Sequence, residues 1–321
     1  MKNISQLTNF YYKTLYPDLQ ELEKERKSLR LRIILVAAFL VFIVFIFILT
    51  AQEVIANHAQ LLLFIGAICV SVISYTYSFF TKDYTKKFKD KIIAPLINRI
   101  DPNLKYMKDF HVPYAHFTRS KIFTDTPDLF EGNDYVTGQI DGINIEFSDI
   151  LAKKEYVNSN DDKKYETMFK GLFIVSEFNK KLKGITVVLP DTAQNTFGDL
   201  LGGWLQSKNL DRNELVKMDN TAFEKEFVVY STDQIEARYI LSHTLMEKLL
   251  KFQKGLKHPI SISFVGGSIY IAVQSNEDQF EPSIFHSLLQ HKVAMEYVST
   301  LHFAIGIVEE LKLNQKLWSK S

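Results

Sequence analysis

Cysteine is nearly absent from this chain of 321 residues, which contains only Cys69. A single cysteine forms no intramolecular disulfide, so oxidised cross-links do not hold the fold together. Cys-X-X-Cys pairs and the His-Glu-X-X-His motif are also missing, so we expect neither a metal site nor another cofactor. Glycine and proline are sparse, and no linker rich in glycine, proline or serine interrupts the chain.

Charge of one sign is not in excess, because the formal net charge is only +1. Such a chain has no general attraction for nucleic acid, and basic and aromatic residues do not interleave as in nucleic-acid readers. The segment GDLLGGWLQSK contains Gly198, Gly202 and Gly203 but lacks the Gly-Lys-Ser/Thr of a phosphate-binding loop. The Gly-X-Ser-X-Gly elbow of hydrolases is missing too. These absences leave no recognised catalytic motif.

Long hydrophobic runs are present at residues 33–51 and 59–80, separated by a short polar segment. A helix that crosses the hydrocarbon core of a bilayer needs about 20 mostly apolar residues, and both runs reach that length. A core helix of a soluble protein would carry a polar stripe, which neither run has. The pattern predicts a transmembrane hairpin. A cleaved signal peptide is disfavoured, because the charged stretch before the first run is long and a second span follows at once.

Basic residues flank the hairpin on its outer sides only. The residues before the first run are Lys24, Arg26, Lys27, Arg30 and Arg32, and those after the second are Lys82, Lys86, Lys87, Lys89 and Lys91. Basic flanks stay on the cytoplasmic side, so we expect a multi-pass membrane protein with both termini in the cytoplasm. The five lysines after the second run are candidate membrane-surface residues that attract anionic lipid headgroups. A solvated charged face is the alternative interpretation.

Helical spacing continues on both sides of the hairpin. Pro17 and Asp18 suit the first turn of a helix that we expect to run without a break into the first span. A second helix follows the second span, and Pro95 should kink or end it. We therefore expect four parts: a cytoplasmic juxtamembrane helix at 1–32, the hairpin at 33–80, a basic juxtamembrane helix at 81–110, and a cytoplasmic domain at 111–321.

The C-terminal part of the chain changes to a β pattern from about Tyr135. Tight hairpin turns are predicted at Asp141-Gly142 and at Gly266-Gly267. Further strands are predicted at 169–178, 184–189 and 226–231, and residues 191–213 are predicted to be loop with short helix.

Helices are expected near the end of the chain. One is capped by Ser242 and stops near Gly255, and a long closing helix runs from about Pro282 to Leu317. Antiparallel hairpins with helices gathered at the end indicate an α+β fold.

Four blocks of sequence are similar to a known family. They are GQIDGINIEFSDI, FKGLFIVSEFNKKLKGITVVL, FEKEFVVYSTDQIEARYILSHTLMEKL and EELKLNQKLW. The chain resembles, from about Tyr135 to Trp318, the bacterial family of proteins of unknown function DUF3137, many of whose members also carry the hairpin. The resemblance implies a bacterial inner-membrane protein and a LemA-like membrane protein as a candidate partner. It implies no catalytic residues.

Candidate ligand-binding residues are Asp233, Glu236 and Arg238, which follow a predicted strand closely. An arginine beside carboxylates can hold a phosphate or a peptide carboxylate, but a structural ion pair is the favoured interpretation. The histidines form no metal-binding pattern, since His286 and His291, like His111 and His116, are five residues apart rather than four.

The expected function is that of a membrane-tethered cytoplasmic binding or scaffold protein, which acts on a membrane protein partner or on lipid headgroups. The alternative is a membrane-anchored enzyme with an unrecognised site near Asp233, Glu236 and Arg238. Transport is disfavoured because two uncharged spans offer no polar path unless several copies assemble, which leaves an oligomer open.

Overall fold

The computed structural model describes residues 4–50, 60–157, 162–177, 182–191, 214–255, 258–275 and 278–318, with the side chains except those of residues 294, 296 and 307–318. The chain divides into two compact units. The helical unit comprises Lys2–Leu96 and Phe280–Val298, and the sheet unit comprises Ile97–Gln279 and Ser299–Ser321. The predicted mixture of helices and antiparallel sheet, with apolar helices at the N-terminus, is confirmed.

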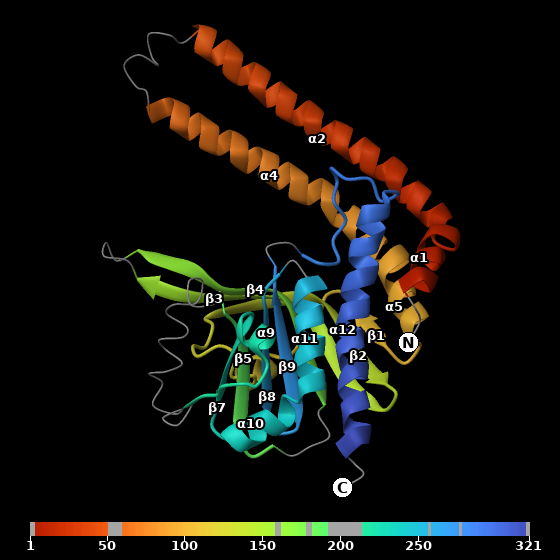
Figure 1. Ribbon diagram of the computed structural model, residues 1–321. Helices are drawn as coiled ribbons and strands as arrows, with labels where there is room; N and C mark the ends of the chain where they lie inside the picture. Colours follow the sequence, from red (N-terminus) through yellow and green to blue (C-terminus); the bar gives the residue numbers. More distant parts are fainter. Residues whose placement is uncertain are drawn as a thin grey trace. The chain divides into compact units, whose positions relative to one another are not determined.

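The helical unit is built around two long helices, α2 (Tyr16–Thr50) and α4 (Gln60–Phe88), which follow the short helix α1 (Ile4–Lys13). The helix α2 passes from its charged half into its apolar half without a break, as predicted. Figure 1 shows α2 and α4 side by side. The buried residues of α2, such as Leu19 and Leu22, lie in its charged half and end at Ile33, the first residue of the apolar run. The charged half therefore carries the core of the unit.

The helix that follows the second apolar run continues past Pro95. A single π-helical turn, η1 (Lys89–Ile93), comes after α4 and leads into α5 (Ala94–Ile100), whose first turn contains Pro95. Proline lacks an amide hydrogen, and its ring crowds the carbonyl four residues earlier. The wider π turn directly before Pro95 accommodates this ring, so the helix does not end there.

The closing helix α12 (His291–Trp318) begins later than the predicted start near Pro282. Residues Phe280–Gln290, called the strap below, are not helical. The Ser283 hydroxyl accepts hydrogen bonds from the amides of Phe285 and His286, both at 3.2 Å. Such local side-chain bonds offer the backbone an alternative to helix, and this explains the error in the predicted start.

The described residues of the sheet unit form a nine-stranded sheet in the order β1-β2-β3-β4-β9-β8-β5-β7-β6, with every neighbouring pair antiparallel. The strands are β1 (Lys105–Met107), β2 (Leu129–Ile140), β3 (Ile143–Val157), β4 (Lys163–Glu177), β5 (Ile185–Pro190), β6 (Glu214–Leu215), β7 (Phe227–Ser231), β8 (Ile260–Val265) and β9 (Ser268–Gln274). The predicted β pattern begins too late, because β2 already starts at Leu129.

Both predicted hairpin turns are present. Ile140 pairs with Ile143, and the two residues between them, Asp141 and Gly142, have φ of 52° and 83°. Positive φ at both positions is the geometry that Asp-Gly favours in a two-residue hairpin. The turn between β8 and β9 likewise has Gly266 at φ 63°. The predicted loop at 191–213, with its three glycines, lies outside the described residues except for Asp191.

Short helices accompany the sheet: α6 (Tyr114–Arg119), α9 (Thr221–Glu224), α10 (Gln234–Ile240) and α11 (His243–Gly255). Phe117 of α6 stacks on Phe123 with ring centroids 4.7 Å apart, and both belong to an aromatic core on the sheet. The helix α11 begins as predicted, since the Leu245 amide donates to the Ser242 hydroxyl at 3.4 Å, and it ends at Gly255.

Replacement of Gly171 by alanine is expected to destabilise the sheet unit. Gly171 has φ of 143°, and an added Cβ would lie 2.1 Å from the Val273 carbonyl oxygen. The strained backbone alone costs roughly 1–3 kcal/mol, and the clash with β9 adds to this. Gly255→Ala is the control, because a Cβ there meets nothing within 4 Å. Urea unfolding of the detergent-solubilised chain, followed by near-ultraviolet circular dichroism, measures both; equal midpoints would contradict the expectation.

Candidate membrane-surface site

Two described helical segments are long and apolar enough to cross a membrane, by length and composition. They are Tyr16–Thr50 and Gln60–Ile100, and only 6% and 0% of their most apolar windows are buried within the structure. Side chains such as Phe39 and Phe64 are 62% and 69% exposed. Buried core helices would not expose such residues, so these helices suggest membrane association.

The charged half of α2 is joined to the end of α4 and to η1 by a ladder of ion pairs. Lys87 Nζ lies 2.8 Å from Glu25, and Lys91 Nζ lies 2.6 Å from Glu21. Residue numbers rise along one helix and fall along the other, so the two helices are antiparallel here. The hydrogen bond that Lys91 donates to Glu21 lowers the pKa of Glu21, and the hydrogen bond that Lys87 donates to Glu25 raises the pKa of Lys87.

Lys89 is also paired, although its side chain is buried rather than exposed. It is the first residue of η1, and its Nζ lies 3.4 Å from a carboxylate oxygen of Glu281 in the strap. Three of the five predicted membrane-surface lysines therefore have acidic partners. The other two, Lys82 and Lys86, are exposed and make no ion pair with a described residue.

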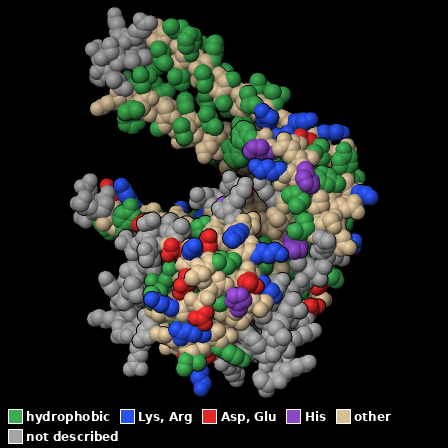
Figure 2. Space-filling view, in the orientation of Figure 1, with side chains coloured by type: hydrophobic (Ala, Val, Ile, Leu, Met, Phe, Trp, Pro, Cys, Tyr) green, Lys and Arg blue, Asp and Glu red, His purple; other side chains and the backbone are tan. Residues whose placement is uncertain are grey.

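Lys82 and Lys86 are not the only exposed cations of this unit, because α2 carries others. From the sequence, those of α2 served only to predict which way round the hairpin lies in the membrane. We call the set the basic collar: Lys24, Lys27, Arg30, Arg32, Lys82 and Lys86, all exposed. None of the six forms an ion pair with a residue that the structure describes. Figure 2 shows Lys and Arg side chains gathered where the apolar surface of the two long helices ends. Of the lysines and arginines of α2, only Arg26 is buried.

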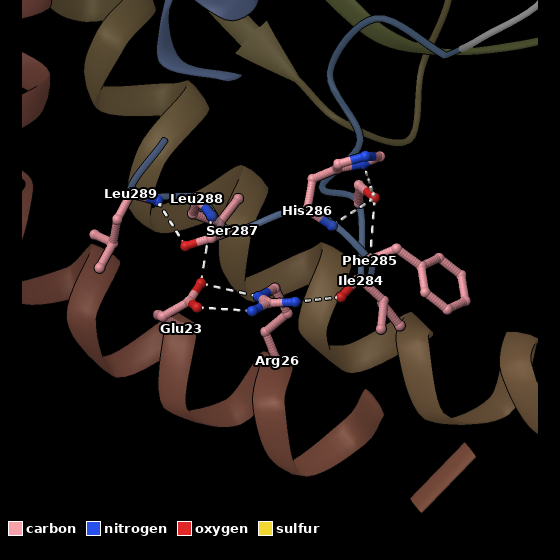
Figure 3. Close-up of polar contacts among 9 residues, drawn as sticks. Glu23, Arg26, Ile284, Phe285, His286, Ser287, Leu288 and Leu289 are labelled. Atoms are coloured by element: carbon pink, nitrogen blue, oxygen red, sulfur yellow. Dashed lines mark hydrogen bonds and ion pairs between the residues drawn. The ribbon is translucent and has the colours of Figure 1, made fainter. Parts of the chain in front are cut away.

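Glu23 and Arg26 of α2 are two further buried charges of the unit, 6% and 4% exposed, and they lie against each other (Figure 3). The guanidinium donates to both carboxylate oxygens, from Nε at 2.9 Å and from Nη2 at 2.7 Å. Burial alone would raise the pKa of Glu23, but the bonds from Arg26, Ser287 and the Leu288 amide lower it below its usual value. The carboxylate is thus charged at neutral pH, and both ions of the pair are held inside the unit.

The same pair holds the strap through its backbone. Arg26 Nη1 donates to the Ile284 carbonyl at 2.5 Å, and the Leu288 amide donates to Glu23 at 3.3 Å (Figure 3). The buried Tyr11 hydroxyl donates to the Leu288 carbonyl at 3.0 Å. A non-helical segment must satisfy its backbone groups elsewhere, and these side chains of α1 and α2 do so.

Tyr84 completes the buried surroundings of this pair. Its ring is fully buried on α4, and its hydroxyl makes no hydrogen bond to a described residue. Burial raises the pKa of Tyr84, while the charge of Arg26 acts in the opposite direction. The ring therefore serves as packing beside Arg26 and Glu23.

The predicted ligand-binding residues lie on α10 in the sheet unit, where they do not form one cluster. Asp233 caps α10 by accepting from the amides of Ile235 and Glu236, both at 3.0 Å. The Glu236 carboxylate accepts from the amides of Lys183 at 3.0 Å and Gly184 at 2.8 Å. Arg238 instead contacts Gln234 at 3.4 Å. The two carboxylates thus fix local backbone, and ligand binding by these residues stays a prediction.

A polar cluster that the sequence did not indicate lies under α6. Glu146 of β3 contacts His116 Nδ1 and accepts from the Tyr135 hydroxyl at 2.5 Å. Burial and the hydrogen bond to Glu146 raise the pKa of Tyr135 to about 12. Tyr135 and Glu146 come from the two strands of one hairpin and His116 from α6, and their meeting depends on the strand register and on the position of α6, which the sequence does not show. Among the described residues, no group of three or more His, Cys, Asp or Glu could hold a metal ion.

A hollow of about 450 Å³ lies near the turn between β2 and β3. Its lining residues are Asp101, Asn103, Gly138, Gln139, Asp141 and Gly142. The lining combines the end of β2, the turn after it and a loop that precedes β1. The predicted residues Asp233, Glu236 and Arg238 are not among them.

The family comparison bears on the sheet unit and the strap. Residues 167–313 match the family "Protein of unknown function (DUF3137)". The resemblance to DUF3137 is confirmed. The matched segment runs from β4 into α12 and contains α10 and the strap, but it is shorter than the predicted range from Tyr135 to Trp318. The DUF3137 match does not reach α2 or α4.

Other comparisons give little beyond DUF3137. No curated protein matches the chain. Among solved structures, the chain is similar to the mycobacterial trehalose monomycolate transport factor A, with 8% identity and a TM-score of 0.33. That alignment covers 64% of this chain and 93% of the other.

Removal of Arg26 is expected to destabilise the helical unit strongly. Arg26→Met leaves Glu23 charged and buried without its partner, which costs about 3–5 kcal/mol. The double change E23L/R26M should cost less than the sum of its parts, because no lone charge remains. The control Lys87→Met removes an exposed ion pair of the same two helices and should have little effect. Unfolding by SDS in mixed micelles compares the unchanged chain with R26M, E23L, E23L/R26M and K87M; an R26M effect as small as that of K87M would contradict the expectation.

Proposed function

We propose that this protein is a membrane-tethered binding or scaffold protein, which acts on a membrane protein partner or on lipid headgroups. The observation that carries the proposal is the continuity of α2, a single helix of 35 residues with an apolar half and a folded, charged half. A bilayer that takes up the apolar half necessarily holds the charged half at its surface. In this proposal α2 tethers the chain, and the rest of the protein acts close to the membrane surface.

The proposed topology is a two-helix hairpin in a bacterial inner membrane, with both termini in the cytoplasm. Its support is the distribution of charge, because the basic collar and the ion-pair ladder both lie at the ends of α2 and α4 outside the apolar runs. The segment 51–59 between the helices contains no lysine or arginine. Basic residues are retained on the cytoplasmic side of a membrane.

Lipid headgroups are one proposed target of the helical unit. The ladder neutralises Lys87 and Lys91, so the collar rather than the whole lysine run supplies attraction to anionic headgroups. This narrows the predicted membrane-surface residues to Lys82 and Lys86 and adds the four cations of α2.

A membrane protein is the other proposed target, and it would bind the sheet unit. The outward face of α10 exposes Ile235, Arg238 and Tyr239, and Ile235 is 82% exposed. An arginine among apolar and aromatic side chains is a composition typical of protein interfaces. A partner whose cytoplasmic segment carries a carboxylate beside apolar residues fits this face. A LemA-like membrane protein is a candidate by family resemblance.

The topology is expected to place residue 321 in the cytoplasm. A reporter that is active only in the cytoplasm, fused after Ser321, should be active in cells. The same reporter inserted within 51–59 should be silent, because that segment is proposed to face outward. Silence at residue 321, together with activity of a periplasmic reporter there, would overturn the orientation.

Partner capture is expected to depend on the face of α10. A tagged chain from detergent-solubilised membranes should enrich an integral membrane protein, and I235D/R238A should lose it because charge and apolar contact are both removed. The control Lys251→Ala alters an exposed residue of α11 and should retain the partner. Mass spectrometry identifies the captured protein in each case. Failure to recover any specific partner, together with no preference of the full-length chain for anionic over neutral lipid, would contradict the proposed function.

A further inference from the structure

The strap carries an exposed aromatic residue at its turn. Phe285 is 58% exposed, whereas its neighbour Ile284 is 1% exposed. The Ser283 hydroxyl binds the Phe285 and His286 amides, and Arg26 binds the Ile284 carbonyl. The backbone on both sides of Phe285 is thus fixed, and the ring is held outward. Figure 3 shows Phe285 pointing away from the pair of Glu23 and Arg26.

The position of Phe285 along α2 follows from its attachment to Arg26. Arg26 precedes the first apolar residue, Ile33, by two helical turns, or roughly 10 Å along the axis. The polar layer on each side of the hydrocarbon core is about 5–8 Å thick. The strap turn therefore lies within side-chain reach of the headgroup layer when the apolar half of α2 spans the bilayer.

The charged residues near this turn are basic, which suits the headgroup layer of an anionic bilayer. Arg30 and Arg32 lie between Arg26 and the apolar run, and Lys82 and Lys86 lie on the adjacent end of α4. These residues belong to the basic collar, which has no ion pair to a described residue. An exposed aromatic ring among unpaired cations is the composition of elements that insert at an anionic lipid surface.

We propose that the strap is an interfacial membrane anchor, in which Phe285 inserts among the headgroups of an anionic bilayer while the basic collar binds their phosphates. The proposal rests on the proposed function, because it requires α2 and α4 to span the membrane. It assigns the pair of Glu23 and Arg26 the role of positioning the strap. The lipid surface thereby contacts a segment that lies more than 200 residues beyond the spans in sequence.

The test places a fluorescent reporter on the strap of the full-length chain. Trp204 and Trp318, the two native tryptophans, are replaced by phenylalanine. Three single substitutions, Phe285→Trp, Tyr16→Trp and Phe64→Trp, are then made separately in that background. Each protein is reconstituted in vesicles of phosphatidylglycerol and phosphatidylcholine, with and without bromine on the acyl chains near the headgroup. Bromine quenches tryptophan on contact, so loss of emission reports insertion.

The two controls bracket the expected depth. Phe64 lies within the second apolar run, and Tyr16 is an exposed aromatic residue at the start of α2, roughly 25 Å before the apolar run. The F285W protein should lose much of its emission and shift it to the blue, the F64W protein should be quenched as well, and the Y16W protein should not.

The outcomes separate the two proposals. Quenching of F64W with F285W unaffected, like Y16W, would overturn the strap as a membrane anchor and leave the tether intact. Absence of quenching in all three would overturn the tether itself. Equal quenching of F285W and Y16W would show non-specific contact and would also overturn the anchor. Adding R26M to the F285W protein should reduce quenching if Arg26 positions the strap.

Discussion

The buried pair of Glu23 and Arg26 is the interaction on which the helical unit depends. Two opposite charges withdrawn from water need each other and further hydrogen bonds, or their desolvation is not offset. Arg26 uses two of its nitrogens on Glu23 and a third on the Ile284 carbonyl, and Glu23 also accepts the Leu288 amide. The pair can therefore be fully satisfied only when the strap is in place. The strap keeps its conformation because the pair binds its backbone, and the pair can stay buried because the strap supplies its remaining hydrogen bonds.

Because α2 is continuous, the buried pair and the strap lie at a fixed distance from the apolar half of the helix. A helix that carries an ion-pair network in one half and an apolar surface in the other fixes the distance between them at 1.5 Å per residue. The ladder of Lys87 with Glu25 and Lys91 with Glu21 aligns α4 with α2 over the same stretch. Exposed pairs of this kind add little stability, but they set the register of the two helices. Pairing of these lysines also decides which cations remain for a membrane surface.

The sequence predicted the features that local chemistry determines. Uncharged runs indicated the two apolar helices, and Asp141-Gly142 indicated a turn that needs positive φ at both residues. The roles of Glu23, Arg26 and Lys89 were not predictable, because charges three residues apart on a helix are usually exposed. Their partners in the strap are about 190 to 265 residues away along the chain. Asp233 and Glu236 are close in sequence and therefore indicated a site, but their oxygens accept from backbone amides. The partners of Asp233 are two and three residues away, and those of Glu236 are 52 and 53 residues away.

The family match contains the strap but not the residues of α2 that bind it. Residues 167–313 include the strap, whereas Glu23 and Arg26 lie far outside the match. Taken alone, the strap is a polar turn whose carbonyl at Ile284 and amide at Leu288 need partners. Those partners come from a helix whose other half is apolar. A strap without α2 would have to satisfy these groups with water and would lose the fixed orientation of Phe285. The N-terminal helices are thus required for the conformation of a segment at the opposite end of the sequence, in addition to any role in the membrane.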